Sequence, residues 1–229
     1  MRILALDTAT EACSVALWHD GDVLQQGSVP VRGHAELLLP MVRALLAEAG
    51  TSLRDLDAIA FGRGPGAFTG VRIAASVTQA LAFGLDRPVV PVSDLAAVAL
   101  RAHREHDARR VLVCMDARMQ EVYVGAFEVP EGGAPVALEA ERVMAPEDVR
   151  LPGGGDWFGA GHGFAAHAGL AAGLALPADR LLSGLLPAAG DVARIAVEAL
   201  RAGRARPAEE ALPVYLRNDV ASTARHSSR

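Results

Sequence analysis

The chain has 229 residues, a formal net charge of −5 and 51% hydrophobic residues, of which few are aromatic. This length allows one large domain or two small ones of about 100 residues each. Nucleic-acid binding proteins usually carry a basic patch, so the acidic balance argues against direct nucleic-acid binding by this chain alone. Local basic patches stay possible, for example at Arg201, Arg204 and Arg206.

The first half of the sequence predicts a βββαβαβα order. Apolar runs predict strands at residues 3–6, 12–18, 23–29, 57–62 and 89–92, and a turn with Gly21 joins the second strand to the third. Helical periodicity predicts helices at residues 33–49, 69–85 and 94–103, and Gly50 closes the first of them. This alternation is typical of an α/β fold.

The second half begins like the first, with an apolar strand that ends in an acid. Residues 111–116 end in Asp116 as the first strand ends in Asp7, and a second strand follows at 121–127. We interpret this as an internal duplication of a strand–Asp–hairpin unit. Further on, the sequence predicts a strand at 156–160, a helix at 191–202 that Asp191 caps, and an extended segment at 213–217.

The pattern therefore predicts two lobes, residues 1–105 and 106–217, and a loose polar tail at 218–229. Cys13 and Cys114 lie far apart inside apolar runs, which predicts buried reduced thiols rather than a disulfide framework. The first residues lack the apolar length of a signal peptide, and no run approaches the ~20 apolar residues of a membrane span. We expect a cytoplasmic protein that is not associated with a membrane.

The most informative segment is a glycine-rich loop between the strand at 57–62 and the following helix. Gly64 and Gly66 permit backbone angles that other residues resist, Pro65 stiffens the turn, and Thr69 is placed to cap the helix. The free N–H groups of a helix start could bind an anion. The alternative is a tight turn that binds nothing, and the absence of Gly-Lys-Ser/Thr excludes a Walker A loop.

Residues 64–72 match the pattern G-P-G-x-F-T-G-x-R and so resemble the signature of the TsaB (YeaZ) family. Further similarity lies at residues 3–17, 34–40, 92–95, 116–123 and 213–217; it is strong over 1–127 and thin from about 128 to 210. The resemblance implies the actin/Hsp70/sugar-kinase superfold with two ribonuclease-H-like lobes, in agreement with the duplication. Fold alone gives no activity.

The resemblance also implies a role in tRNA modification. In this family the partner is TsaD, which works with the ATPase TsaE to transfer a threonylcarbamoyl group to a tRNA adenosine next to the anticodon. We expect this chain to be a non-catalytic activating subunit that contacts tRNA only through the complex. The alternatives are an inactive or weakly active ATP-binding enzyme of the kinase-like superfold, and a peptidase, as the family was once described.

Candidate catalytic groups are weak. Asp7 and Asp116 resemble paired acids that hold Mg²⁺ through water, but we favour strand-end carboxylates bonded to backbone N–H groups. Glu11 in the first loop would repel a phosphate. TsaD carries a His-x-x-x-His metal pair on the helix that begins near Asp94 here, and the position four residues on is Val98.

Two other histidine pairs are present in the sequence. His103 and His106 lie in a charged stretch, and His162 and His167 have the wrong spacing for one helical face. We therefore expect no catalytic residue, no metal and no cofactor in the isolated chain, with ATP or ADP possible only at a subunit interface. We expect the residues that correspond to a nucleotide-binding loop to be structural or a vestige of such a site. They are Asp7, Gly64, Pro65, Gly66, Thr69, Gly70, Arg72 and Asp116.

The helices at 33–49 and 69–85 are apolar around more of their circumference than one sheet can cover. A surface helix needs an apolar stripe of somewhat more than 100°, whereas the first helix has an apolar arc of about 220° at the ordinary helix period. Either other helices of the chain bury the excess, or it faces a partner. We expect a surface shared by a homodimer and by TsaD, built from Leu37, Leu38, Met41, Leu45, Val77 and Leu81.

Overall fold

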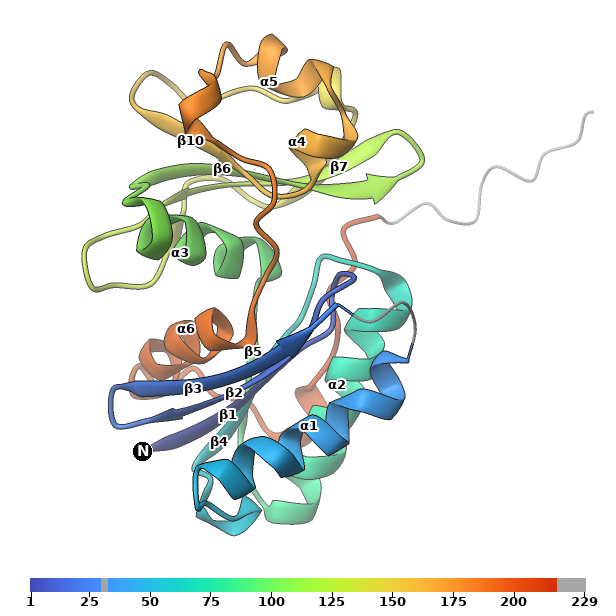
Figure 1. Cartoon of the computed structure of the whole chain (residues 1–229), viewed down its shortest axis with the longest axis vertical. Coiled ribbons are helices and arrows are strands. Elements are labelled where there is room, and N and C mark those ends of the chain that lie inside the picture. The colour runs from blue at the N-terminus through green and yellow to red at the C-terminus, as the bar shows by residue number, and fades with distance from the viewer. Residues whose placement is uncertain (30–32, 218–229) are drawn as a thin grey trace, which may run out of the picture.

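The structure, a computed structural model, describes residues 1–29 and 33–217. Two sheets lie one above the other in Figure 1, and helices lie between them and on their outer faces. The first sheet has the order β3-β2-β1-β4-β5. Its strands are β1 (Arg2–Asp7), β2 (Cys13–His19), β3 (Asp22–Ser28), β4 (Ala58–Gly62) and β5 (Val89–Val92).

Alternating side chains of the first sheet fill two cores. In β1, Leu4 and Leu6 pack under α1 (His34–Glu48) and α2 (Phe68–Leu85), whereas Ile3 and Ala5 pack under α6 (Ala189–Arg201) on the opposite face. A strand that is buried on both faces reads as a continuous apolar run, which is why the sequence predicted it well.

The second sheet repeats the arrangement of the first. Its strands are β6 (Arg110–Arg118), β7 (Glu121–Glu128), β8 (Val136–Ala137), β9 (Arg142–Met144), β10 (Trp157–Ala160) and β11 (Leu181–Leu182). β7 is antiparallel to β6 and to β8 and β9, while β10 and β11 run parallel to β6. β1, β2, β3, β4 and β5 pair in the same way. The repeat confirms the predicted duplication and the superfold of two ribonuclease-H-like lobes.

The two lobes exchange a helix. α3 (Asp94–His106) follows the first sheet in the chain but packs on β6 and β7, and α6 follows the second sheet but packs on β1 and β2. Figure 1 shows α3 and α6 facing each other between the sheets. The predicted lobe boundary at residue 105 therefore divides the chain by sequence order, whereas by packing α3 belongs with the second sheet and α6 with the first.

The remaining elements are short. The second lobe also contains α4 (Gly163–Ala166) and α5 (Gly169–Gly173), and the 3₁₀ turns are η1 (Leu53–Asp55), η2 (Pro146–Asp148), η3 (Ala178–Arg180) and η4 (Ala208–Glu210). The predicted loose tail at 218–229 lies outside the described residues. α2 has the length and mean hydropathy of a membrane span, but its buried side packs in the core beside α1.

Both predicted N-terminal helix caps are wrong. The N-cap position of α2 is Ala67, so Thr69 lies inside the first turn. The N-cap position of α6 is Ala188, and Asp191 is buried in the first turn. Its carboxylate accepts a hydrogen bond from Arg104 of α3 at 2.7 Å instead. Propensity places a polar residue near a helix start, but tertiary partners decide which residue begins the helix.

Candidate functional site

The glycine-rich loop is clamped to the turn that follows β1. The backbone N–H of Ala67 donates to the carbonyl of Ala9 at 2.7 Å, and the Thr8 hydroxyl donates to the carbonyl of Gly70 at 2.7 Å. On its other side the loop meets the C-terminal segment, where the Val214 N–H donates to the carbonyl of Arg63 at 2.7 Å. The loop thus joins three distant parts of the chain.

The glycines of the loop are required for different physical reasons. Gly64 has a φ of 100°, in the left-handed region that favours glycine. Gly66 and Gly70 have no such φ; they allow close approach instead. A Cβ on Gly66 would lie 2.4 Å from the Ala9 carbonyl oxygen, and one on Gly70 would lie 1.9 Å from that of Thr8. The prediction that Gly66 serves unusual backbone angles is therefore wrong.

Two buried carboxyl groups face each other over the end of β4. The side chains of Asp7 and Asp94 are fully buried, and an oxygen of each lies within 2.4 Å of the place where a Cβ on Gly62 would sit. Asp94 also accepts from the Gly64 N–H at 2.5 Å. Burial, and then the charge of Asp7, raise the pKa of Asp94 well above its usual range; burial also raises the pKa of Asp7. Through its bond from Gly64, Asp94 holds the start of the glycine-rich loop at the end of β4.

Asp94 was not among the predicted site residues. A signal was nevertheless present, because β1, β4 and β5 are parallel neighbours and their carboxyl ends meet at one edge of the sheet. Asp7 ends β1, Gly62 ends β4 and Asp94 follows β5. Once the strand order is known, the three residues must lie together.

A cavity of about 920 Å³ opens between the two lobes beside this loop. Its apolar walls come from Phe68 and Tyr215, among others, and Arg72 spans them. The Arg72 guanidinium stacks on the Phe68 ring at 3.6 Å from its centre and donates to the Tyr215 hydroxyl at 2.7 Å. Tyr215 belongs to the segment 213–217, which the sequence predicted to be extended.

The two acids predicted at strand ends, Asp7 and Asp116, bond to the backbone. The Ala9 N–H donates to Asp7 at 3.1 Å, and the Arg118 N–H donates to Asp116 at 3.0 Å, as the strand-end interpretation predicted. Only Asp116 of the two lines the cavity, where the Arg118 guanidinium lies 3.2 Å from it. The Glu11 carboxylate also lines the cavity, so a bare phosphate would meet two acids there.

The structure places Val98 and the histidines of the second lobe in different surroundings. Val98 is fully buried in the second lobe's core. His162 lines the interlobe cavity, and burial lowers its pKa; His167 lies 3.5 Å from Asp116. Within residues 1–29 and 33–217, no three His, Cys, Asp or Glu side chains cluster closely enough to hold a metal ion.

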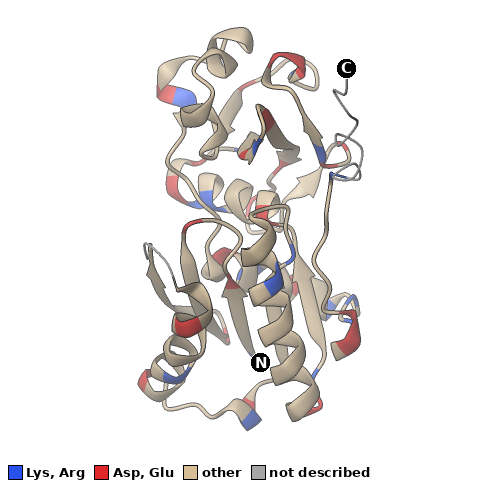
Figure 2. Ribbon diagram, turned by 90° about the vertical axis from the view of Figure 1, so that its right-hand side faces the viewer, with Lys and Arg blue, Asp and Glu red and all other residues tan. Residues whose placement is uncertain are grey.

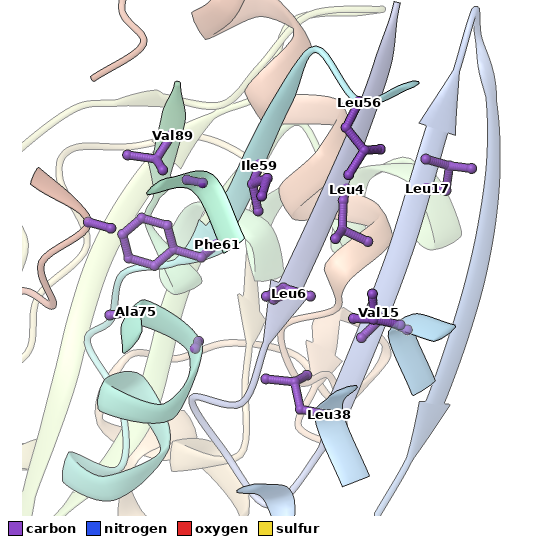
Figure 3. Packing of buried hydrophobic residues seen from close by; sticks show 14 of the residues in the cluster. Leu4, Leu6, Val15, Leu17, Leu38, Leu56, Ile59, Phe61, Ala75 and Val89 are labelled. Atoms are coloured by element: carbon purple, nitrogen blue, oxygen red, sulfur yellow. The ribbon is translucent and has the colours of Figure 1, made fainter. Parts of the chain in front are cut away.

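The predicted partner surface divides into core and surface residues. Leu38 and Leu45 are fully buried in the first lobe, and Figure 3 shows Leu38 beside Leu6 and Val15 of the sheet. Placing them on a contact surface was wrong, because they point at the sheet that α1 covers. The helical period alone gives the width of an apolar arc but not its orientation.

The other members of that set are partly exposed. Leu37, Met41, Val77 and Leu81 are half-buried, and the last three pack against the first core. Further out, α1 exposes Leu39 (41% exposed), Pro40, Ala44 and Ala47, and α2 exposes Ser76, Ala80, Phe83 and Gly84. α2 has one charged residue, Arg72, so the central helix of Figure 2 is tan along nearly its whole length. The two helices lie on the same face of the first sheet (Figure 1).

Comparison with known proteins gives consistent results. The model of the family "TsaD: tRNA N6-adenosine threonylcarbamoyltransferase" matches residues 25–155. The tRNA threonylcarbamoyladenosine biosynthesis protein TsaB of Escherichia coli strain K12 is 46% identical over 226 residues, which cover 96% of each chain. TsaB of Haemophilus influenzae is 50% identical over 123 residues, 54% of this chain and 52% of that one.

A solved structure agrees with the sequence relatives. YeaZ from Pseudomonas aeruginosa is 52% identical, has a TM-score of 0.88, and is matched over 94% of this chain and 99% of its own. Similarity on this scale extends over both lobes, including the region where the motifs are thin. The chain therefore belongs to the TsaB (YeaZ) family of tRNA threonylcarbamoyladenosine biosynthesis proteins.

Proposed function

We propose that this chain is a non-catalytic subunit that binds and activates a TsaD-type threonylcarbamoyltransferase. The observation that carries the proposal is the exposed face of α1 and α2. On α2 this face is small or apolar except for Arg72, and on α1 it presents Leu39, Pro40, Ala44 and Ala47 beside Arg43. Burying exposed leucine and phenylalanine side chains against a partner lowers the free energy by about 25 cal/mol per Å² of apolar surface. A face with small residues and one charged residue in its second helix lets a partner's helices approach closely.

The family relationship supports the choice of partner. The TsaD family model matches more than half of this chain, so the two proteins share a fold. A face that pairs with its own copy about a two-fold axis can pair with a relative that presents a similar face. We therefore expect one surface to serve the homodimer of the isolated chain and the heterodimer with TsaD.

The remaining partners follow from the same proposal. TsaE joins the TsaD complex, and tRNA contacts this chain only through the complex. Any site for ATP or ADP lies at a subunit interface rather than in the isolated chain. The cellular location is then the cytoplasm, where the assembly meets tRNA.

The interlobe cavity favours a second candidate function, a small-molecule enzyme or a peptidase. Its volume of about 920 Å³ suits a ligand, and one solved relative is described by its similarity to peptidase YEAZ. Two observations favour the subunit role. Glu11 and Asp116 line the cavity and would repel a phosphate, and Asp7 is buried against Asp94 and does not line the cavity. Turnover of ATP or of a peptide by the pure chain, lost in Asp116→Ala, would favour the enzyme.

The binding test uses two leucines of equal exposure. Leu39 on α1 and Leu138 in the second lobe are both 41% exposed. Leu39→Glu should weaken TsaD binding by at least about 30-fold, because a charge would be buried without a partner, and should shift the isolated chain toward monomer. Leu138→Glu should change neither. Isothermal titration with TsaD and light scattering after gel filtration measure both effects. If Leu39→Glu stays dimeric and binds TsaD normally, the interface lies elsewhere.

A further inference from the structure

A second pocket lies on α3 and α6, apart from the interlobe cavity and from the outer face of α1 and α2. Its volume is about 610 Å³, and α3, α6 and the loop at residues 132–134 line it. α3 packs on the second sheet and α6 on the first, so both lobes contribute to this pocket. A pocket of this size suits a small molecule.

The charges in this pocket are unbalanced. Three arginines line it, Arg104, Arg194 and Arg201, whereas Glu198 is the one carboxylate in the lining that the structure describes. Beneath them the buried carboxylate of Asp191 binds Arg104 at 2.7 Å. Arg104 thus has two acidic partners, Asp191 and Glu105, and Glu198 is the one carboxylate of the described lining that remains for Arg194 and Arg201.

Two of these arginines have no acidic partner in the described ranges. Arg194 is partly buried, and its one hydrogen bond goes to the Gly190 carbonyl of its own helix at 3.1 Å. Arg201 is exposed and forms no ion pair with residues 1–29 or 33–217. Glu105 pairs with Arg101 at 2.9 Å and with Arg104 at 3.9 Å. Burial and the charge of Arg104 lower the pKa of Arg194, and the charge of Asp191 partly opposes this shift.

The wall behind the arginines is apolar. Trp18, Leu100 and Val197 are each less than a tenth exposed and line the pocket. An apolar wall lowers the local dielectric and strengthens the attraction between an arginine and an anion. It also offers a surface for the uncharged body of a ligand. In addition, the buried Nδ1 atom of His103 has no hydrogen-bond partner among the described residues.

We propose that the α3–α6 pocket binds a small organic oxyanion, a phosphate ester or a carboxylate, between the guanidinium groups of Arg194 and Arg201. Guanidinium groups bind either oxyanion through paired charge-assisted hydrogen bonds. The ligand removes the excess positive charge and satisfies donors that the protein leaves free. This site is independent of the proposed partner surface.

The test is a thermal-shift titration of the full chain. Inorganic phosphate and citrate serve as the phosphate and carboxylate probes, with NaCl at matched ionic strength as the reference. We expect phosphate, citrate or both to raise the melting temperature above the NaCl reference in a saturable manner, because a ligand that binds the folded state stabilises it. The more effective probe identifies the oxyanion.

Substitutions assign the effect to the pocket. Arg201→Gln and Arg194→Gln should each raise the half-saturating concentration by about ten-fold or more. Arg201 is exposed, so its variant should fold even if Arg194→Gln does not. Arg204→Gln, an exposed arginine outside the pocket lining, should titrate as the wild type does. The proposal is overturned if both probes match NaCl, or if Arg201→Gln keeps the wild-type half-saturation.

Discussion

Substituting Gly70 by alanine tests whether the glycine-rich loop is needed for packing. A Cβ at this position would lie 1.9 Å from the Thr8 carbonyl oxygen, and the Thr8 hydroxyl donates to the Gly70 carbonyl. Backbone, not a flexible side chain, must therefore move. Overpacking of this kind costs about 1–3 kcal/mol and the disturbed hydrogen bond about 1 kcal/mol, so we expect a loss of about 2–4 kcal/mol.

The same helix supplies the control. Gly84 also lies in α2, and an added Cβ would meet nothing within 4 Å. Gly84→Ala should be neutral or stabilise the protein by up to about 1 kcal/mol through helix propensity. At about 2–4 °C per kcal/mol for a chain of this size, Gly70→Ala should lower the melting temperature by about 5–15 °C. Equal melting temperatures for the two variants would refute the close-approach argument.

Three further predictions follow from buried residues. The pKa of Asp94 is higher in the folded protein than in the unfolded chain. Protonation of Asp94 therefore contributes fully to stability below about pH 4, the usual pKa of an aspartate in an unfolded chain. This contribution is lost as the pH rises through the pKa of the folded protein. The melting temperature of Asp94→Asn relative to wild type should therefore increase from pH 4 to 7; a constant difference would contradict this. Leu38→Arg should abolish soluble expression, while Leu39→Glu yields a folded protein by circular dichroism. Burial raises the pKa of Cys13 to about 11 and also that of Cys114, so Ellman's reagent should label neither thiol before unfolding and both after it.

The sequence predicted the strands and helices of the first lobe well because β1, β2, β4 and β5 are buried on both faces. An apolar run such as residues 3–6, followed by Asp7, leaves little choice of structure. The second lobe was harder to predict. β8 and β11 have two residues each, and α4 and α5 have four and five, too short for any periodicity. Their positions depend on tertiary packing, which one sequence does not display.

The sequence identified several residues of the candidate site correctly but gave the wrong physical reason for some of them. Gly64, Gly66 and Gly70 were singled out, but only Gly64 adopts a positive φ, and the other two depend on the approach of the Thr8–Ala9 turn. Such an approach joins residues about sixty positions apart, so no local pattern could reveal it.

The central claim, that this chain activates a TsaD-type enzyme through α1 and α2, is tested most directly by reconstituted tRNA modification. Threonylcarbamoyladenosine formed on tRNA is measured with TsaD, TsaE and the threonylcarbamoyl donor, together with wild type, Leu39→Glu or Leu138→Glu, each below saturation. We predict equal product with wild type and Leu138→Glu, little without the chain, and at least about ten-fold less with Leu39→Glu. Full activity with a folded Leu39→Glu variant, or without the chain, would contradict the claim.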